Sequence, residues 1–148
     1  MTKLKSISLM FISFITFGTA VMAQSDNKVT DDELKQFVAS VQKIQILNQE
    51  SQQQMIKIVE DNGLKVERFN EIAEAAQDPN KASDASENEM KKFTDINTSI
   101  EKIYASSQKK IEEIIKVEGL SIERYQIIAS EIQSKPELQE RIQKFINN

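Results

Sequence analysis

The sequence predicts an all-α protein, a helical bundle built from two copies of a long-helix/short-helix hairpin and a C-terminal helix. Two observations favour this fold. The 148 residues include only three glycines and two prolines, and they are rich in Glu, Lys, Gln and Ile, most of which are good helix formers. In addition, similar segments recur at a spacing of 56 residues. A repeat of this length indicates duplication of one supersecondary unit.

The clearest repeated segments are residues 63–69 (GLKVERF) and 119–125 (GLSIERY), which we interpret as helix corners. Glycine after a helical run adopts the left-handed conformation that ends a helix, and the residue after it packs on the preceding turn. An aromatic residue five positions further on then forms a hydrophobic staple at the start of the next helix. The residues predicted to form the two corners are Gly63, Leu64, Phe69, Gly119, Leu120 and Tyr125.

The N-terminal residues 1–23 have the form of an export signal peptide. Lys3 and Lys5 supply a positive end, residues 7–17 are mostly apolar, and residues 21–23 (VMA) form a small-residue cleavage site. The apolar run is shorter than the roughly 20 residues that span a bilayer. We therefore expect a periplasmic or secreted chain with no membrane span after signal cleavage, with residues 24–29 as a flexible leader. Retention of the signal as an anchor is the alternative.

Each long helix is predicted to begin at a capping box and to end at a corner glycine. The boxes are residues 30–33 and 86–89, where Thr or Ser precedes Glu by three positions. Apolar residues then follow in steps of three and four, which predicts helices of about 31 residues. Asn48 and Ser51 fill the two middle places of the first stripe, and Tyr104 takes the place of Asn48 in the second as a core residue. Whether the helices are straight or kinked near Asn48 and Ser51 stays open.

The short helices are predicted to fold back, each on the C-terminal half of its own long helix, because they are too short to be stable alone. A third capping box at residues 134–137 opens the terminal helix, which has apolar residues on one face. The expected single domain spans residues 30–146, with repeat 1 at 30–79, repeat 2 at 86–135 and the terminal helix at 136–146.

Three segments resemble a known family. Residues 30–37 (TDDELKQF) are similar to the start of the bacterial domain of unknown function 4168 (DUF4168) family, and residues 119–125 with residues 136–142 (PELQERI) resemble its closing signature. The likeness covers roughly residues 30–143. The resemblance implies an exported helical protein, and it implies no activity because none is assigned to the family.

The residue types exclude most site chemistry. The chain has no histidine and no cysteine, so it lacks the groups for a catalytic triad, thiol chemistry or an ordinary zinc site. We therefore predict no enzyme, no cofactor and no catalytic residue. Residues 78–89 partly match a calcium loop, but Ala82 and Ser83 stand where an oxygen ligand and a glycine belong, so a simple loop is favoured and no metal site is predicted.

Arginines recur at one place in both repeats, as Arg68 and Arg124. They could clamp an anionic ligand on the pseudo-two-fold axis, but an ion pair with a long-helix carboxylate such as Asp61 or Glu118 is the favoured interpretation. Together with Arg141 of the terminal helix, they are the candidate partner contacts.

The function predicted from these features is a non-catalytic interaction or structural domain, bound to an unknown protein partner or to itself. With 23 acidic against 19 basic residues, a nucleic-acid partner is disfavoured. The alternative is a periplasmic chaperone-like or hydrophobic-ligand binder in which the hairpins part to expose Phe37, Phe93, Ile44 and Ile100. Catalysis by the carboxylates Glu71, Glu112 and Glu113 is disfavoured, because such groups on helices are usually solvated. The sequence leaves the partner's identity and the oligomeric state undetermined.

Overall fold

A computed structural model describes residues 28–77 and 84–146. In these residues it contains five helices and no strand: α1 (Asp31–Asp61), α2 (Val66–Gln77), α3 (Glu87–Val117), α4 (Ile122–Ser134) and α5 (Pro136–Ile146). The all-α prediction, with two long-helix/short-helix hairpins and a terminal helix, is therefore confirmed. The predicted signal peptide, residues 1–23, lies outside the described residues.

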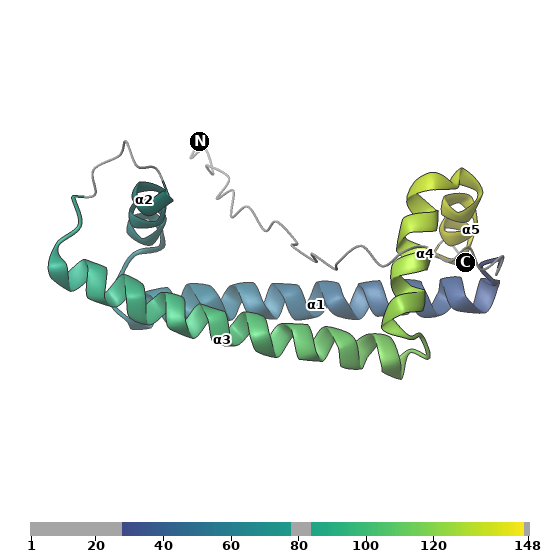
Figure 1. Cartoon of the computed structure of the whole chain (residues 1–148), viewed down its shortest axis with the longest axis horizontal. Helices are drawn as coiled ribbons and strands as arrows, with labels where there is room; N and C mark the ends of the chain where they lie inside the picture. The colour runs from purple at the N-terminus through teal and green to yellow at the C-terminus, as the bar shows by residue number, and fades with distance from the viewer. Residues whose placement is uncertain (1–27, 78–83, 147–148) are drawn as a thin grey trace.

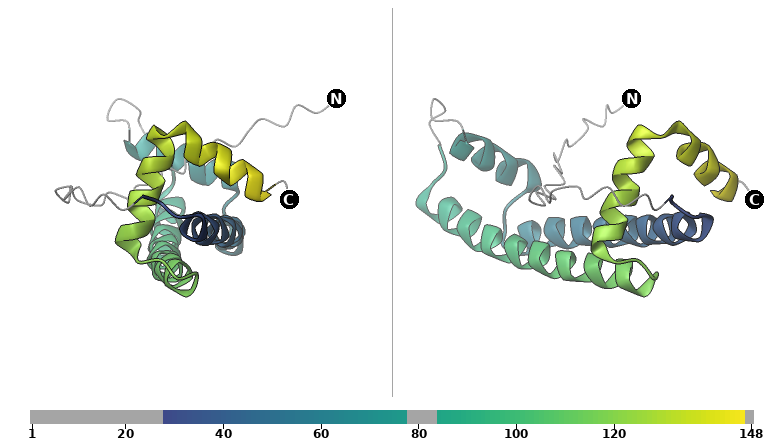
Figure 2. Two further views of the ribbon diagram at one scale, coloured as in Figure 1. Left: turned by 90° about the vertical axis from the view of Figure 1, so that its right-hand side faces the viewer. Right: turned by 45° about the vertical axis from the view of Figure 1, so that its right-hand side comes forward.

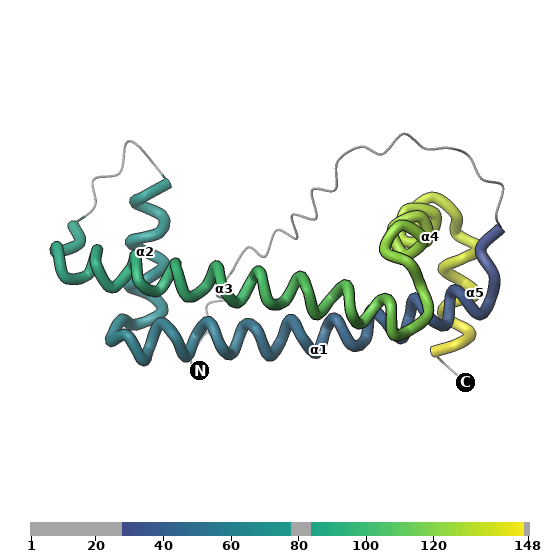
Figure 3. Tube along the Cα trace, turned by 60° about the horizontal axis from the view of Figure 1, so that its bottom comes forward, coloured from purple at the N-terminus to yellow at the C-terminus, as the bar shows by residue number. Residues whose placement is uncertain are grey.

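The two long helices, α1 and α3, lie side by side and antiparallel along the length of the molecule (Figure 1). Helices α2 and α4 rise from the same face of this pair at its opposite ends and run across it (Figure 2). Helix α5 packs beside α4 at the N-terminal end of α1, and among the described helices none occupies the matching place beside α2 (Figure 3). In the described part of the chain, the middle of the α1–α3 pair is therefore two helices wide.

Both long helices begin at the predicted capping boxes. The Thr30 hydroxyl accepts a hydrogen bond from the Glu33 amide, and the Glu33 carboxylate accepts from the Thr30 amide; Ser86 and Glu89 do the same at the start of α3. The helices are 31 residues long, as predicted, and α1 continues without interruption through the polar region around Asn48.

The corners have the geometry that a glycine end requires. Gly63 and Gly119 have φ angles of 70° and 98°. The Leu64 amide donates to the Val59 carbonyl at 3.2 Å, and the Leu120 amide donates to the equivalent carbonyl at 3.1 Å. These bonds satisfy the last carbonyls of each long helix. The chain thereby turns from each long helix into the following short helix within four residues.

The third capping box is wrong. Ser134 is the last residue of α4, and its hydroxyl donates back to the carbonyls of Ser130 and Glu131. Helix α5 instead begins at Pro136, whose fixed φ and missing amide suit the first position of a helix.

The apolar residues form two separate clusters, and each cluster contains residues of both repeats. The α2-end cluster joins the C-terminal part of α1, α2 and the first half of α3, with Val59, Leu64, Ile72 and Ile96 as its buried residues. The α4-end cluster joins the N-terminal part of α1, the end of α3, α4 and α5; its buried residues are Val29, Leu34, Ile115, Leu120, Ile128 and Leu138. Val29, at the end of the predicted flexible leader, is thus part of this core. The repeats are interlocked at both ends of the molecule.

The predicted position of the short helices is therefore only partly right, because each short helix packs on both long helices. Two aromatic pairs make this plain. Phe37 of α1 lies against Tyr125 of α4 with ring centroids 4.7 Å apart, and Phe93 of α3 lies against Phe69 of α2 at 5.0 Å. Each pair joins the long helix of one repeat to the short helix of the other.

The predicted core stripe is wrong at Asn48 and Tyr104, whereas the other predicted middle residue, Ser51, is buried. Asn48 is exposed and Tyr104 is 46% exposed, whereas Leu47 is buried. Steps of three and four lead from Ile44 to Ser51 either through Leu47 or through Asn48, so the spacing alone fits both residues. The packing of α1 against α3 selects Leu47.

We predict that Gly119→Ala destabilises the fold by about 1 to 2 kcal/mol, since a left-handed conformation is costly for a residue with a Cβ. The added Cβ would also lie 2.7 Å from the Gln36 Nε2 atom. Urea unfolding measures the effect. Gly119→Asn is the matched control and should be milder, because asparagine tolerates this conformation better. Equal stability of the alanine variant and the native chain would contradict the prediction.

Candidate functional site

The two repeated arginines join the repeats to each other. Arg124 of α4 donates from Nε and Nη2 to the two Glu33 carboxylate oxygens at 2.6 and 2.9 Å. Arg68 of α2 donates in the same way to Glu89 of α3, at 2.8 and 3.4 Å. Each glutamate is the capping-box residue of the other repeat. The predicted ion pairing is thus present with different carboxylates: the suggested partner Glu118 pairs with Lys43 instead.

These arginines do not form one anion site, because they lie at opposite ends of the α1–α3 pair. Arg68 is further engaged by Glu71 and Asp84, each at 3.0 Å. The hydrogen bonds from Arg124 lower the pKa of Glu33 from 4.5 to about 2, against the opposing effect of burial and with help from Thr30. Those from Arg68 likewise lower the pKa of Glu89 to about 2. Both carboxylates are therefore structural anions.

Arg141 fixes α5 to the start of the domain. Its guanidinium pairs with Asp31, and its Nη1 donates to the Val29 carbonyl at 3.1 Å. Nearby, the Lys35 ammonium lies 5.5 Å from the ring centroid of Phe145. The terminal helix covers the α4-end cluster in this way.

Of the carboxylates considered for catalysis, Glu71 and Glu112 are surface charges with ordinary partners, and Glu113 lines a hollow described below. Glu71 pairs with Arg68, and Glu112 lies 3.8 Å from Lys116. Part of the calcium-loop candidate, residues 78–83, lies outside the described residues, and its Glu89 is committed to Ser86 and Arg68. The described part of the chain contains no group of three or more His, Cys, Asp or Glu side chains that could hold a metal ion.

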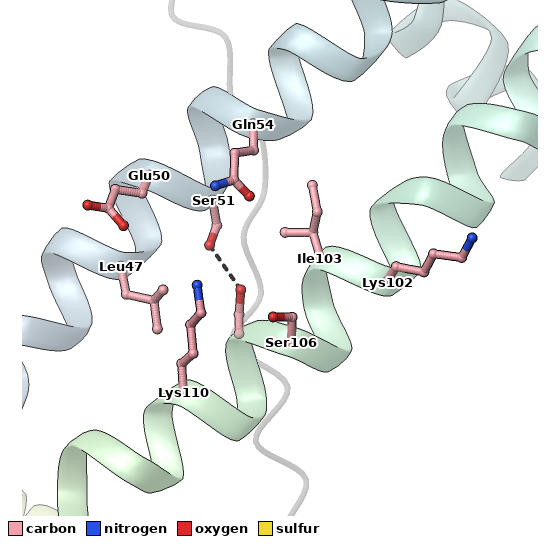
Figure 4. A pocket seen from close by; sticks show the side chains of 9 residues that line it. Leu47, Glu50, Ser51, Gln54, Lys102, Ile103, Ser106 and Lys110 are labelled. Atoms are coloured by element: carbon pink, nitrogen blue, oxygen red, sulfur yellow. Dashed lines mark hydrogen bonds between the residues drawn. The ribbon is translucent and has the colours of Figure 1, made fainter. Parts of the chain in front are cut away.

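The structure places a hollow of about 190 Å³ in the middle of the α1–α3 pair. Ser51 and Ser107, which are equivalent residues of the two repeats, share a hydrogen bond of 2.9 Å there (Figure 4). The pseudo-two-fold axis of the duplication therefore passes between them. Both helices supply the lining residues: Leu47, Glu50, Ser51, Gln54, Lys102, Ile103, Ser106, Ser107 and Lys110.

A second hollow, of about 380 Å³, adjoins the first toward the α4 end and shares Leu47, Glu50 and Lys110 with it. It is lined by Lys43, Ile46, Leu47, Glu50, Lys110, Glu113, Ile114, Val117 and Glu118. Ile46 is 57% exposed and Val117 is 78% exposed, although both are large and apolar. We call this second hollow the central groove, and it is the candidate functional site.

Sequence reasoning missed the central groove because it used the repeats only where they agree. The positions at which the two repeats differ indicate the groove. The residues equivalent to Ile46 and Val117 in the other repeat are Lys102 and Asp61, which suit an exposed helix surface. An apolar residue replaces a charged one at both places on the groove.

Within residues 28–77 and 84–146, none of the helices combines the length and apolarity that crossing a bilayer requires.

We predict that acid weakens the fold through Glu33 and Glu89. Both have pKa values lowered to about 2 in the folded chain, so the unfolded chain takes up protons first as the pH falls below about 4.5. The stability that they contribute is full above that pH and is lost toward pH 2. Glu33→Gln should reduce the difference in unfolding free energy between about pH 7 and about pH 3. Glu60→Gln, at an exposed position of α1, is the control and should leave that difference unchanged.

We also predict energetic coupling across the pseudo-two-fold axis. Replacing either Ser51 or Ser107 with Ala should cost about 0.5 to 1.5 kcal/mol, and the double variant should cost less than the sum, because no hydroxyl then lacks its partner. Urea unfolding of the double-mutant cycle measures the coupling. Ser99, whose hydroxyl bonds to the Asp95 carbonyl of its own helix, is the control. Additive losses of stability for Ser51 and Ser107 would contradict the prediction. A coupling of Ser51 to Ser99 as large as that to Ser107 would contradict it as well.

One family model, described as Domain of unknown function (DUF4168), matches the chain twice, over residues 19–84 and over residues 78–142. Each match covers one of the two repeats, which agrees with the duplicated hairpins of the structure. Neither the curated proteins nor the solved structures contain a match to the chain. Because the two matches together cover most of the sequence, the chain belongs to the DUF4168 family.

Proposed function

We propose that this chain is an exported, non-catalytic interaction protein that binds another polypeptide through the central groove. The observation that carries the proposal is the exposure of Ile46 and Val117 at the groove. Exposed apolar residues grouped over a hollow favour a binding surface, whereas scattered ones need no explanation. The bacterial, exported character of the chain rests on the form of residues 1–23 and on the family resemblance.

The frame that carries the groove supports this role. Both ends of the α1–α3 pair are closed by apolar clusters and by the Arg68–Glu89 and Arg124–Glu33 pairs. A surface held between two fixed ends loses little conformational entropy when it binds, which favours affinity. The charged side chains of these pairs hold the helices together. The central groove, by contrast, keeps apolar side chains exposed to solvent.

We favour this function over the chaperone-like alternative, in which the two hairpins part. Phe37 and Ile44 pack in one cluster, and Phe93 and Ile100 pack in the other. Parting the hairpins would break both clusters, because each contains residues of both repeats. The loss of that apolar burial opposes opening.

The proposal predicts position-dependent cross-linking. A photoreactive amino acid at Val117 should cross-link to a polypeptide when the protein is expressed in its own compartment. The same amino acid at Asp61, the equivalent position of the other repeat, should not, because Asp61 lies outside the groove. Mass spectrometry of the products measures both yields. Equal yields at the two positions would contradict the use of the groove.

A further inference from the structure

We propose that the occupant of the central groove is a second copy of this chain, so that the protein is a two-fold dimer of α1–α3 pairs. This inference rests on the proposed function and names its partner. In the dimer, the apolar residues Ile46, Leu47, Ile114 and Val117 of one copy contact those of the other.

Within the described residues, the exposed apolar pair of the groove has no copy at the equivalent positions of the other half, although the hairpin is duplicated. The same backbone positions in the other half carry Lys102 and Asp61 in place of Ile46 and Val117. The fold therefore tolerates charged residues there and does not require the apolar ones. Their presence places an apolar patch on this half of the α1–α3 pair, and a patch that contacts its own copy suits a closed dimer and does not favour an open chain of copies.

The charges around the patch alternate in sign. At one end of the groove, Lys43 of α1 pairs with Glu118 of α3. At the other end, Glu50 of α1 and Lys110 of α3 line the groove together, next to Ser51 and Ser107. These four charged residues stand at the four corners of the groove. Each helix supplies one positive and one negative corner, two turns apart, with the apolar residues between them.

This pattern is complementary to itself. If the dimer axis runs parallel to the helices, α1 of one copy faces α3 of the other. Lys43 then faces the second copy's Glu118, and Glu50 faces the second copy's Lys110. An axis across the helices would also match these four corners, but it would set the fifth charged residue, Glu113, against the second copy's Glu113. The parallel axis avoids that repulsion.

Other occupants fit this pattern less well. A segment with charges of one sign would meet two corners of its own sign, which costs free energy at the rim of an interface. An uncharged apolar helix would remove the water that hydrates all four charged side chains and would offer them no charged partner in exchange. A second copy supplies the opposite charge at each corner, together with a matching apolar centre.

The test is the mass of the native chain and of Ile46→Lys/Val117→Asp, measured by sedimentation equilibrium over micromolar to millimolar concentrations. These substitutions reproduce the residues of the other half, so the variant should fold, and circular dichroism checks this. We expect a native dimer and a dissociation constant raised at least about a hundredfold in the variant, because four apolar side chains leave each interface. The control is Ile56→Lys, since Ile56 is 41% exposed and lies outside the groove; it should remain dimeric.

A native chain that stays monomeric over this range would overturn the inference, as would a variant that still dimerises like the native chain. The Val117 cross-link separates this failure from that of the proposed function. A monomer that cross-links at Val117 to a different polypeptide contradicts the second copy alone. A monomer without any Val117 cross-link contradicts both proposals.

A charge swap tests the orientation. Glu50→Lys and Lys110→Glu should each weaken the dimer, because either change sets like charges against each other at both corners. An equimolar mixture of the two variants should restore dimerisation, since each lysine then faces a glutamate of the other chain. A mixture as weak as the separate variants would overturn the arrangement with the parallel axis.

Discussion

The fold depends on a glutamate that serves two repeats at once. Glu33 caps its own helix through Thr30 and also accepts two hydrogen bonds from Arg124 of the other repeat. Glu89 has the same double role toward Ser86 and Arg68. The same carboxylate therefore caps the start of a long helix and holds the short helix of the other repeat. The position of each short helix depends on where that long helix begins. The aromatic pairs beside these glutamates tie the same elements together.

This exchange between repeats explains the shape of the molecule. Each end contains apolar residues from both repeats, whereas in the middle the described residues belong to α1 and α3. The contact between these two helices there consists of small and medium side chains around the Ser51–Ser107 hydrogen bond. The hollows occur at this section because two helices alone cannot enclose a wide core.

The departures from symmetry are as informative as the symmetry. Helix α5 covers one end through Leu138 and Arg141, and none of the other described helices takes the equivalent place at the opposite end. Ser40, buried at the end that α5 covers, takes the place of the fully buried Ile96. The exposed Ile46 and Val117 form the third departure, and together they leave apolar surface of the central groove in contact with water.

The amino-acid sequence by itself determined the elements: the capping boxes, the corner glycines and the 56-residue period depend on local backbone chemistry and are visible in a linear chain. It also indicated the arginines. Only the tertiary structure decided their partners, because Glu33 and Arg124 lie 91 residues apart and meet only through the exchange between repeats. The burial of Leu47 instead of Asn48 likewise depends on the packing of α1 against α3, because steps of three and four from Ile44 to Ser51 can pass through either residue. The central groove arises from the same packing, since residues of two distant helices become one surface only when those helices lie side by side.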